Sequence, residues 1–151
     1  MQVSYPTSTN GKTNFTEQET SSEPSVRITN PDGQYTLLMI DPDAGKTTNT
    51  NTSPGNTKGL YYLHWLVVNI PASGNVKEGD AVVPYAGPTP PAGTGQHRYM
   101  FILYKQRVGI TTGMTIQERG GWNLQQFLQG KELTEVARKT IHVPLKLNGK
   151  K

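Results

Sequence analysis

Side chains that could do chemistry lie in or at the ends of apolar runs in this sequence. They comprise two carboxylates, two imidazoles and a phenol, at Asp41, Asp43, His64, His97 and Tyr99. Such groups can hydrogen-bond an anion, ligate a metal ion or transfer protons. Singly, each also has an ordinary structural explanation, because an Asp beside Pro often forms a turn and a strand histidine is often a hydrogen-bonded core residue. Their combination on separate apolar segments is what points to a site.

Three apolar runs must position these side chains, and all three are predicted to be β-strands. They span 35–41, 60–70 and 97–104 and are rich in branched and aromatic residues. The first run is apolar on both faces, which is typical of a central strand that is covered on both sides.

The alternation of side chains along these strands groups the polar residues. Asp41 shares a face with the apolar residues of its strand, and His97 shares a face with Tyr99. If the three strands are neighbours, one pocket contains these three residues together with His64. Glycines before the third strand would let the backbone approach a ligand and offer amide donors to an anion, at Gly87, Gly93 and Gly95.

The composition predicts a mainly β protein with one domain over 1–151. Among 151 residues, 16 are Gly and 11 are Pro, and a length near 150 suits one core. A short helix is predicted after Asn123 and ends near Gly130, because the apolar residues between them have helical spacing. A second helical stripe is predicted over 133–140, followed by an edge strand over 141–147 that contains Pro144.

Two connecting segments are predicted to be irregular. Residues 46–59 are rich in Thr, Asn, Ser and Gly and cannot bury enough apolar surface to order themselves, so they are predicted to form a mobile surface loop. Residues 86–95 contain several prolines, which restrict φ and favour a rigid connection. A rigid irregular segment that leads into a buried strand is suited to form the wall of a site.

The net charge of +4 does not indicate a nucleic-acid-binding surface. Residues 1–130 carry nine basic and nine acidic side chains, so the excess lies in 131–151, where a basic terminus is usually solvated. The absence of cysteine excludes disulfides and a cysteine nucleophile. No window reaches the ~18 apolar residues of a membrane span, and the first ten residues lack a signal-peptide pattern. A cytoplasmic, soluble protein without a nucleic-acid partner is expected.

Three motifs in this chain resemble those of one known family. Tyr35–Ala44 is similar to a strand that ends in the motif DPDAP, and His64–Pro71 resembles HW-x-V-x-N-I/M-P. Tyr85–Phe101 resembles the long motif GP-x-PP-x-G-x-G-x-HRY-x-F. The family is the phosphatidylethanolamine-binding proteins, also called the Raf kinase inhibitor protein family. The firm resemblance covers about residues 35–107, and the order and spacing of the motifs agree.

The resemblance implies a fold and a binding site. The fold is a central antiparallel sheet packed on a smaller one, with short peripheral helices and an anion pocket at the strand ends. The function implied is non-enzymatic binding of a phosphate group, on a phospholipid head group or a phosphorylated partner, with regulation of a kinase or inhibition of a protease. No metal or other cofactor is implied. The ligand residues carried over are Asp41, His64, Gly87, His97 and Tyr99, and the secondary pocket residues are Asp43, Tyr85, Pro88 and Pro91.

Two departures from the family pattern leave other functions open. Gly45 stands where the first motif has its second proline, and about residues 131–151 form a shortened basic ending. A scaffold or protein-interaction relative that has lost ligand binding is therefore one alternative. A hydrolase or metal-site enzyme is another, although no local metal-binding or nucleophile motif supports it. If protonated histidines lead the site, anion binding should be tighter near pH 6 than near pH 8.

Overall fold

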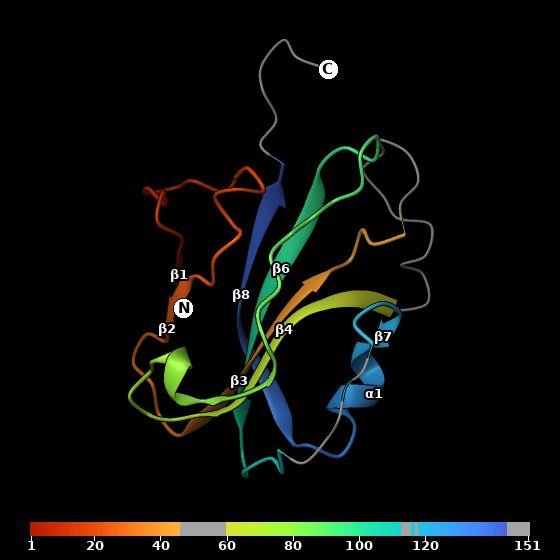
Figure 1. The fold of residues 1–151 in the computed structure, drawn as a ribbon. Helices are drawn as coiled ribbons and strands as arrows, with labels where there is room; N and C mark the ends of the chain where they lie inside the picture. Colours follow the sequence, from red (N-terminus) through yellow and green to blue (C-terminus); the bar gives the residue numbers. More distant parts are fainter. Residues whose placement is uncertain (46–59, 113–115, 117, 145–151) are drawn as a thin grey trace.

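The computed structural model describes residues 1–45, 60–112, 116 and 118–144, and most of its elements are antiparallel strands (Figure 1). A large sheet has the strand order β5-β4-β3-β6-β8, with every neighbouring pair antiparallel. Its strands are β3 (Gln34–Asp41), β4 (Leu60–Ile70), β5 (Asp80–Val83), β6 (His97–Gln106) and β8 (Leu133–Val143).

Smaller elements lie around the large sheet. Strands β1 (Gln2–Ser4) and β2 (Ser25–Arg27) form a two-stranded antiparallel sheet, and β7 (Trp122–Asn123) pairs with the start of β4. Among the described residues, the helices are a single 3-10 turn, η2 (Val76–Glu78), and the short α1 (Leu124–Leu128). The predicted architecture, a central antiparallel sheet with a smaller sheet and short peripheral helices, is confirmed.

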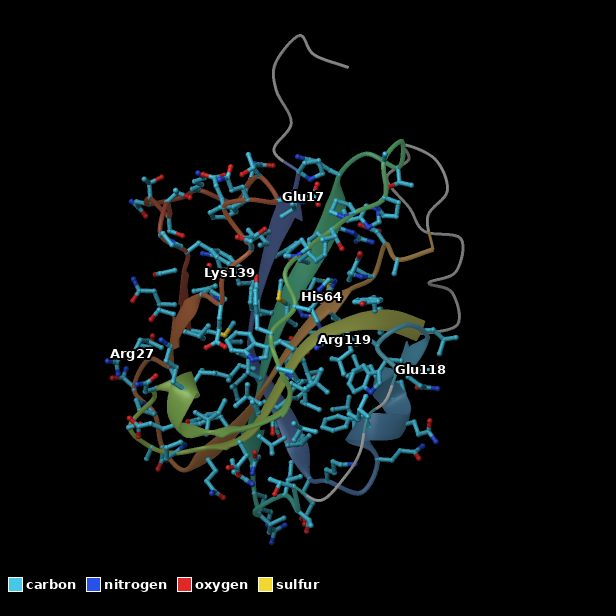
Figure 2. All side chains as sticks on the ribbon, in the orientation of Figure 1. Glu17, Arg27, His64, Glu118, Arg119 and Lys139 are labelled. Carbon is cyan, nitrogen blue, oxygen red and sulfur yellow. The ribbon has the colours of Figure 1, made fainter. Side chains whose placement is uncertain are left out.

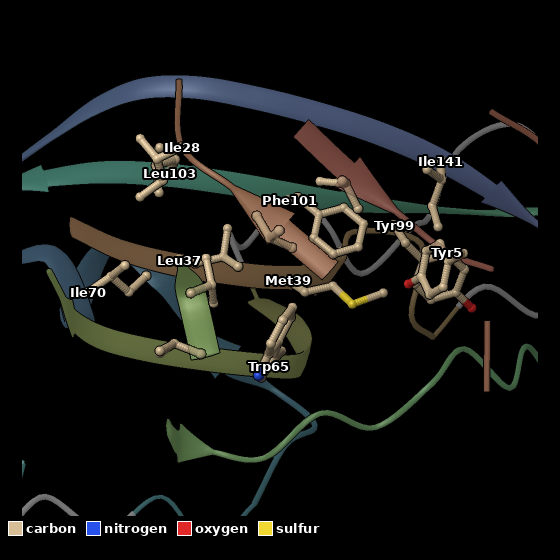
Figure 3. Close-up of a cluster of buried hydrophobic side chains, with 14 of the residues drawn as sticks. Tyr5, Ile28, Leu37, Met39, Trp65, Ile70, Tyr99, Phe101, Leu103 and Ile141 are labelled. Atoms are coloured by element: carbon tan, nitrogen blue, oxygen red, sulfur yellow. The ribbon is translucent and has the colours of Figure 1, made fainter. Parts of the chain in front are cut away.

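The core has two layers, one on each face of the large sheet. Leu37 and Met39 of β3 pack on the face that the β1–β2 sheet covers (Figure 3), whereas Leu38 and Ile40 face the layer beneath α1. All four side chains are fully buried. The prediction that this run is a central strand covered on both sides is confirmed, because alternate residues enter different cores.

The helix near the C-terminus is also confirmed, with the cap that the sequence predicts. The side chain of Asn123 accepts a hydrogen bond from the backbone N–H of Gln126 at 3.0 Å, which satisfies one of the free donors of the first turn. Gly130 follows the helix with a φ of 72°, a conformation that suits glycine after a helix end.

The second predicted helix, over 133–140, is wrong. These residues belong to β8, which pairs with β6 from Leu133 to Val143. The helical spacing of the apolar residues is coincidental: Val136 lies 51% exposed, so no apolar helical stripe is buried. The ladder to β6 outweighs the local pattern, as tertiary pairing often does in strands with β-branched residues. In the described part of the chain β8 is the last strand of the sheet, but it ends at Val143, so Pro144 follows the strand and does not lie within it. Residues 145–147 of the predicted edge strand lie outside the described residues.

Asn69 fastens the far end of the sheet, where β4 ends. Its backbone has a left-handed φ of 55°. Its side-chain oxygen accepts hydrogen bonds from Gln106 Nε2 at 2.9 Å and from the backbone N–H of Ile110 at 2.8 Å. Its amide nitrogen donates to the Ile110 carbonyl at 2.8 Å and to Asp80 at 3.0 Å. Gln106 in turn accepts from Thr36 at 2.7 Å, so the cluster joins β3, β4, β5 and β6.

Two sequence predictions concern parts outside the described residues. They are the mobile loop over 46–59 and the portion of the basic ending beyond Pro144. Within the described ranges, no helix has the length and apolar character needed to cross a membrane.

Candidate functional site

A cavity of about 230 Å³ lies where β3, β4 and β6 meet the segment that joins β5 to β6. Asp41 ends β3, His64 projects from β4, and His97 and Tyr99 project from β6. Figure 2 shows His64 near the middle of the molecule, beside the segment that leads from β5 to β6. The lining residues are Asp41, Ala44, Gly45, Tyr62, His64, Thr89, Pro90, Pro91, His97 and Tyr99.

A chain of buried hydrogen bonds connects Asp41 and His97. Asp41 Oδ2 lies 2.8 Å from His97 Nδ1, and Asp41 Oδ1 accepts from the backbone N–H of Asp43 at 2.7 Å. The other ring nitrogen of His97, Nε2, lies 2.9 Å from Thr94 Oγ1, which donates to the Pro91 carbonyl at 2.6 Å. Burial raises the pKa of Asp41, while the hydrogen bond and charge of His97 act in the opposite direction. Both nitrogens of His97 are therefore engaged by protein groups.

His64 differs from His97 in its hydrogen bonds, because only one of its ring nitrogens has a partner among the described residues. Its Nδ1 lies 2.7 Å from the Ala86 carbonyl, so Nδ1 carries a proton and donates it. Burial lowers the pKa of His64 to about 4, and the positive charge of Arg119 acts in the same direction. His64 is consequently neutral between pH 6 and pH 8. Protonation of His64 near pH 6 is not supported, because its buried ring resists protonation, whereas tighter anion binding near pH 6 stays a prediction.

The Tyr99 side chain lines the cavity, and its hydroxyl forms a hydrogen bond with the Asp41 carboxyl. Burial raises the pKa of Tyr99 far above its ordinary value, and the nearby Asp41 carboxyl raises it further. The phenol therefore stays protonated. Its ring meets the His64 ring edge to face, with centroids 5.2 Å apart, and stacks against the His97 ring at 6.3 Å. These contacts fix the phenol between the two imidazoles.

Five of the nine sequence-predicted residues line the cavity, and four do not. Pro91 joins Asp41, His64, His97 and Tyr99 in the lining. The other four, which lie outside the lining, are Gly87, Asp43, Tyr85 and Pro88. That any of the nine contacts a ligand stays a prediction.

Asp43 serves the frame of the site. It is 2% exposed, and its carboxylate accepts the backbone N–H of Arg98 at 2.8 Å. The Arg98 guanidinium also donates two hydrogen bonds to this carboxylate, from Nε at 3.1 Å and from Nη2 at 2.8 Å. Such a bidentate pair fixes geometry. Asp43 thereby holds the segment after β3 against the start of β6.

Gly87 and Tyr85 attach the β5–β6 segment to the N-terminal region. A Cβ at Gly87 would lie 2.7 Å from the Thr20 carbonyl oxygen, so only glycine fits there. The Tyr85 hydroxyl donates to that same carbonyl at 2.7 Å and lies 2.7 Å from the Tyr5 hydroxyl. Because the proton of Tyr85 goes to Thr20, the Tyr5 hydroxyl donates to Tyr85.

Sequence reasoning missed Tyr62, Thr94 and Arg119. Tyr62 lies two residues before His64 on the same strand, so side-chain alternation could have identified it. Thr94 stands between two glycines with positive φ, Gly93 at 84° and Gly95 at 72°, which turn its hydroxyl toward His97. Arg119 donates to the carbonyls of His64 and Pro84, both at 2.9 Å, and no sequence pattern indicates such backbone contacts.

Within residues 1–45, 60–112, 116 and 118–144, no three His, Asp or Glu side chains come together in a way that could hold a metal ion. The polar groups at the cavity instead suit hydrogen bonding to a small ligand, with the phenol as donor and an imidazole nitrogen as acceptor. A compact cavity at the ends of buried strands is typical of a small-ligand-binding protein.

Comparisons with known proteins identify the family. The family model described as phosphatidylethanolamine-binding protein matches residues 5–145, so this chain belongs to that family. It is 37% identical over 107 residues to the rice (Oryza sativa subsp. japonica) protein MOTHER of FT and TFL1 homolog 2, covering 69% of this chain and 56% of that protein. The chain spans about half the length of the curated relatives it matches.

Solved structures agree with this fold. A phosphatidylethanolamine-binding protein from Plasmodium vivax superposes with a TM-score of 0.66 and 24% identity, over 93% of this chain and 82% of that one. A carboxypeptidase Y inhibitor, solved with its cognate proteinase, gives a TM-score of 0.65 and 22% identity, over 87% and 74%. Identities at this level establish the fold alone.

Proposed function

We propose that this chain is a non-enzymatic binding protein whose cavity holds the phosphate group of a small ligand, a lipid head group or a phosphorylated partner. The observation that carries the proposal is the fully buried Tyr99 phenol at a small cavity, kept protonated by its raised pKa. Such a donor forms a charge-assisted hydrogen bond to an anion. Membership of the phosphatidylethanolamine-binding family supports the same ligand class.

The arrangement of the histidines supports binding rather than catalysis. His97 has both ring nitrogens engaged by Asp41 and Thr94, so it has no free nitrogen to serve as a base. His64 keeps one free nitrogen, but a pKa near 4 makes it a weak base at neutral pH. A protein that binds without turnover suits this arrangement.

Regulation of a partner protein is the biological role we propose for the bound state. One solved neighbour of this fold is a carboxypeptidase Y inhibitor, which supports a protease as one class of partner. A kinase is the other class that the family resemblance implies. A protease or a kinase would bind the surface around the cavity. Such binding requires the small ligand only if the ligand alters that surface.

The binding proposal is tested by titrating the protein with phosphoethanolamine and following amide and histidine resonances by NMR. Shifts are expected for Tyr99, His64 and Gly45, which line the cavity. Tyr99→Phe should weaken binding by about 1.5–3 kcal/mol, the usual contribution of a hydrogen bond to a charged group. Tyr104→Phe is the matched control, since Tyr104 is a buried tyrosine of the same strand that faces the other core.

Failure has a clear signature in this experiment. If millimolar phosphoethanolamine leaves the resonances of the lining residues unmoved, the proposed function is wrong, and a scaffold that has lost ligand binding becomes the better description. If Tyr99→Phe and Tyr104→Phe weaken binding equally, the ligand does not depend on the cavity donor.

A further inference from the structure

Strand β8 pairs with another strand of the large sheet along one edge only in the described part of the chain. Its other edge contacts the N-terminal region at a single point. There the backbone N–H of His142 donates to the Thr13 carbonyl at 2.8 Å, and the His142 carbonyl accepts from the backbone N–H of Phe15 at 3.0 Å. This contact is a one-residue parallel bridge, so the edge already takes part in backbone hydrogen bonds with a segment outside the large sheet.

The contact at His142 shows which other backbone groups of β8 point outward. Along a strand, the N–H and C=O of successive residues point to opposite edges in turn. Counting back from His142, the outward residues are Thr140 and Arg138, whereas Ile141 and Lys139 point toward β6. No group in the described part of the chain bonds the outward N–H or C=O of Thr140 or Arg138. This part of the edge is therefore open.

The open part of the edge has a limit at each end. Before it, the register between β8 and β6 shifts and leaves Val136 as the extra residue of a β-bulge, which interrupts the regular edge. After it, the bridge to Asn14 occupies the edge. Residues 137–141 remain, a length of about 16 Å at the usual rise per strand residue. The exposed Val136 side chain offers an apolar contact beside this stretch.

The charged side chains of this stretch are both basic. Lys139 forms no ion pair with any described residue, and Figure 2 shows it beside β8, on the side of the N-terminal region. Arg138 pairs with Glu135 at 2.8 Å, but both side chains are exposed, so water weakens this pair. The edge therefore combines unused backbone hydrogen-bonding groups with a local excess of positive charge.

These charges disfavour a second copy of this chain as the occupant of the edge. In an antiparallel pair of copies, outward residues face outward residues, so each Arg138 would lie opposite its own equivalent or opposite Thr140. The latter register places each Lys139 opposite its equivalent. A third register, with Thr140 opposite itself, brings the added strand onto the bridge at Asn14. Like charges directly opposite each other destabilise a strand pair, whereas opposite charges stabilise it.

We propose that the edge of β8 over residues 137–141 binds an extended acidic segment of a partner protein, which adds a further strand to the large sheet. Such strand addition takes its affinity from main-chain hydrogen bonds and its specificity from alternate side chains. The partner's backbone bonds the outward groups of Arg138 and Thr140, and its carboxylates lie near Arg138 and Lys139. None of these residues lines the cavity, so this surface is separate from the ligand-binding proposal.

Amide hydrogen exchange of the free protein gives the first test. The amides of Arg138 and Thr140 should exchange rapidly because water is their partner, whereas those of Lys139 and Ile141 should be protected by β6. If Arg138 and Thr140 are already protected, the edge is occupied by a second copy or by another part of the chain, and the proposal is wrong. Sedimentation at several protein concentrations then separates these two occupants.

The binding test compares three capped seven-residue peptides by NMR at low ionic strength. The first alternates glutamate with valine, and the second alternates lysine with valine. The third is the glutamate peptide with N-methyl groups on three successive central residues, which removes hydrogen-bond donors from both of its edges. The glutamate peptide should protect the amides of Arg138 and Thr140. It should bind about tenfold or more tightly than either of the other two peptides.

Charge reversal at two exposed or partly exposed lysines gives a matched pair of variants. Lys139→Glu should weaken binding of the glutamate peptide about fivefold and strengthen binding of the lysine peptide by a similar factor. Lys77→Glu changes the net charge equally but lies on η2, outside the large sheet. It should alter both affinities by less than about twofold, because salt screens charges that are far apart.

Three results would overturn the proposal. Equal binding of the glutamate and lysine peptides would show that the edge does not select acidic segments. Equal binding of the parent and N-methylated peptides would show that the peptide does not add a strand. Equal effects of Lys139→Glu and Lys77→Glu would show that net charge, and not the edge, attracts the peptide. None of these results depends on whether the cavity binds phosphoethanolamine.

Discussion

The cluster around Asn69 allows a quantitative prediction about the end of the sheet remote from the cavity. Replacing Asn69 removes four side-chain hydrogen bonds, of which the one to Asp80 is exposed and contributes little. The remaining three should contribute about 1 kcal/mol each. Asn69→Gly, which tolerates the φ of 55°, should therefore lower the free energy of unfolding by about 3 kcal/mol.

Asn69→Ala should cost more than Asn69→Gly, because alanine also opposes the left-handed backbone. The additional loss is about 1 kcal/mol, which gives about 4 kcal/mol in total. Asn30 is the matched control: it has a φ of 50° but is exposed and makes no side-chain hydrogen bond in the described ranges. Asn30→Ala should cost only the backbone contribution, about 1 kcal/mol.

Urea unfolding with linear extrapolation measures all three variants against the parent protein. Losses below about 1 kcal/mol for both Asn69 variants would show that the cluster does not fasten the strands. Equal losses for Asn69→Gly and Asn69→Ala would refute the backbone part of the reasoning. Equal losses for Asn69→Ala and Asn30→Ala would refute the hydrogen-bond part.

Three further predictions concern the cavity and its wall. Arg119→Gln should raise the pKa of His64 above about 4, measured by NMR titration of the imidazole, because a nearby positive charge is removed; an unchanged pKa would refute this coupling. Between pH 7 and pH 4.5, His64 should reduce the free energy of unfolding by about 2 kcal/mol, because the unfolded chain binds a proton near pH 6.5 that the native ring accepts only near pH 4. Urea unfolding at the two pH values should show a smaller decrease in His64→Gln, and an equal decrease would contradict the assignment. Gly87→Ala should destabilise the fold by about 1–3 kcal/mol through its clash with Thr20, whereas Gly109→Ala, with its nearest contact at 3.8 Å, should be nearly neutral in the same assay.

The strands that carry the site were predictable because their residue types favour β-structure and their apolar residues are buried where the strand pattern requires. The predicted limits of 60–70 match those of β4, and 97–104 falls within β6. Alternation correctly placed His97 and Tyr99 on one face, and both line the cavity. In β8 the local pattern was ambiguous, because its apolar residues fit a helical period while its hydrogen-bond partner, β6, lies far away in the sequence.

The proton states of the site could not be predicted from residue types. His64 and His97 are both histidines that line one cavity, but their hydrogen-bond partners differ. His64 bonds to a carbonyl, whereas His97 bonds to a carboxyl and a hydroxyl. Two of these partners, the Ala86 carbonyl and the Thr94 hydroxyl, come from the irregular segment between β5 and β6, whose course depends on the whole fold. Gly87 illustrates the same limit, because its role in packing against Thr20 depends on a segment more than sixty residues away.

The hydroxyl contacts from Tyr5 through Tyr85 to Thr20 attach the wall of the cavity to the N-terminal region. Ala86 exchanges two hydrogen bonds with His64, one through the backbone at 2.9 Å and one through the imidazole at 2.7 Å. The cavity wall therefore cannot separate from β4 without releasing His64 and disturbing its contacts with residues 5–20. These segments form one cooperative opening unit, whose amides should share a single free energy of hydrogen exchange. A ligand that bonds to His64 should slow exchange as far away as Thr20.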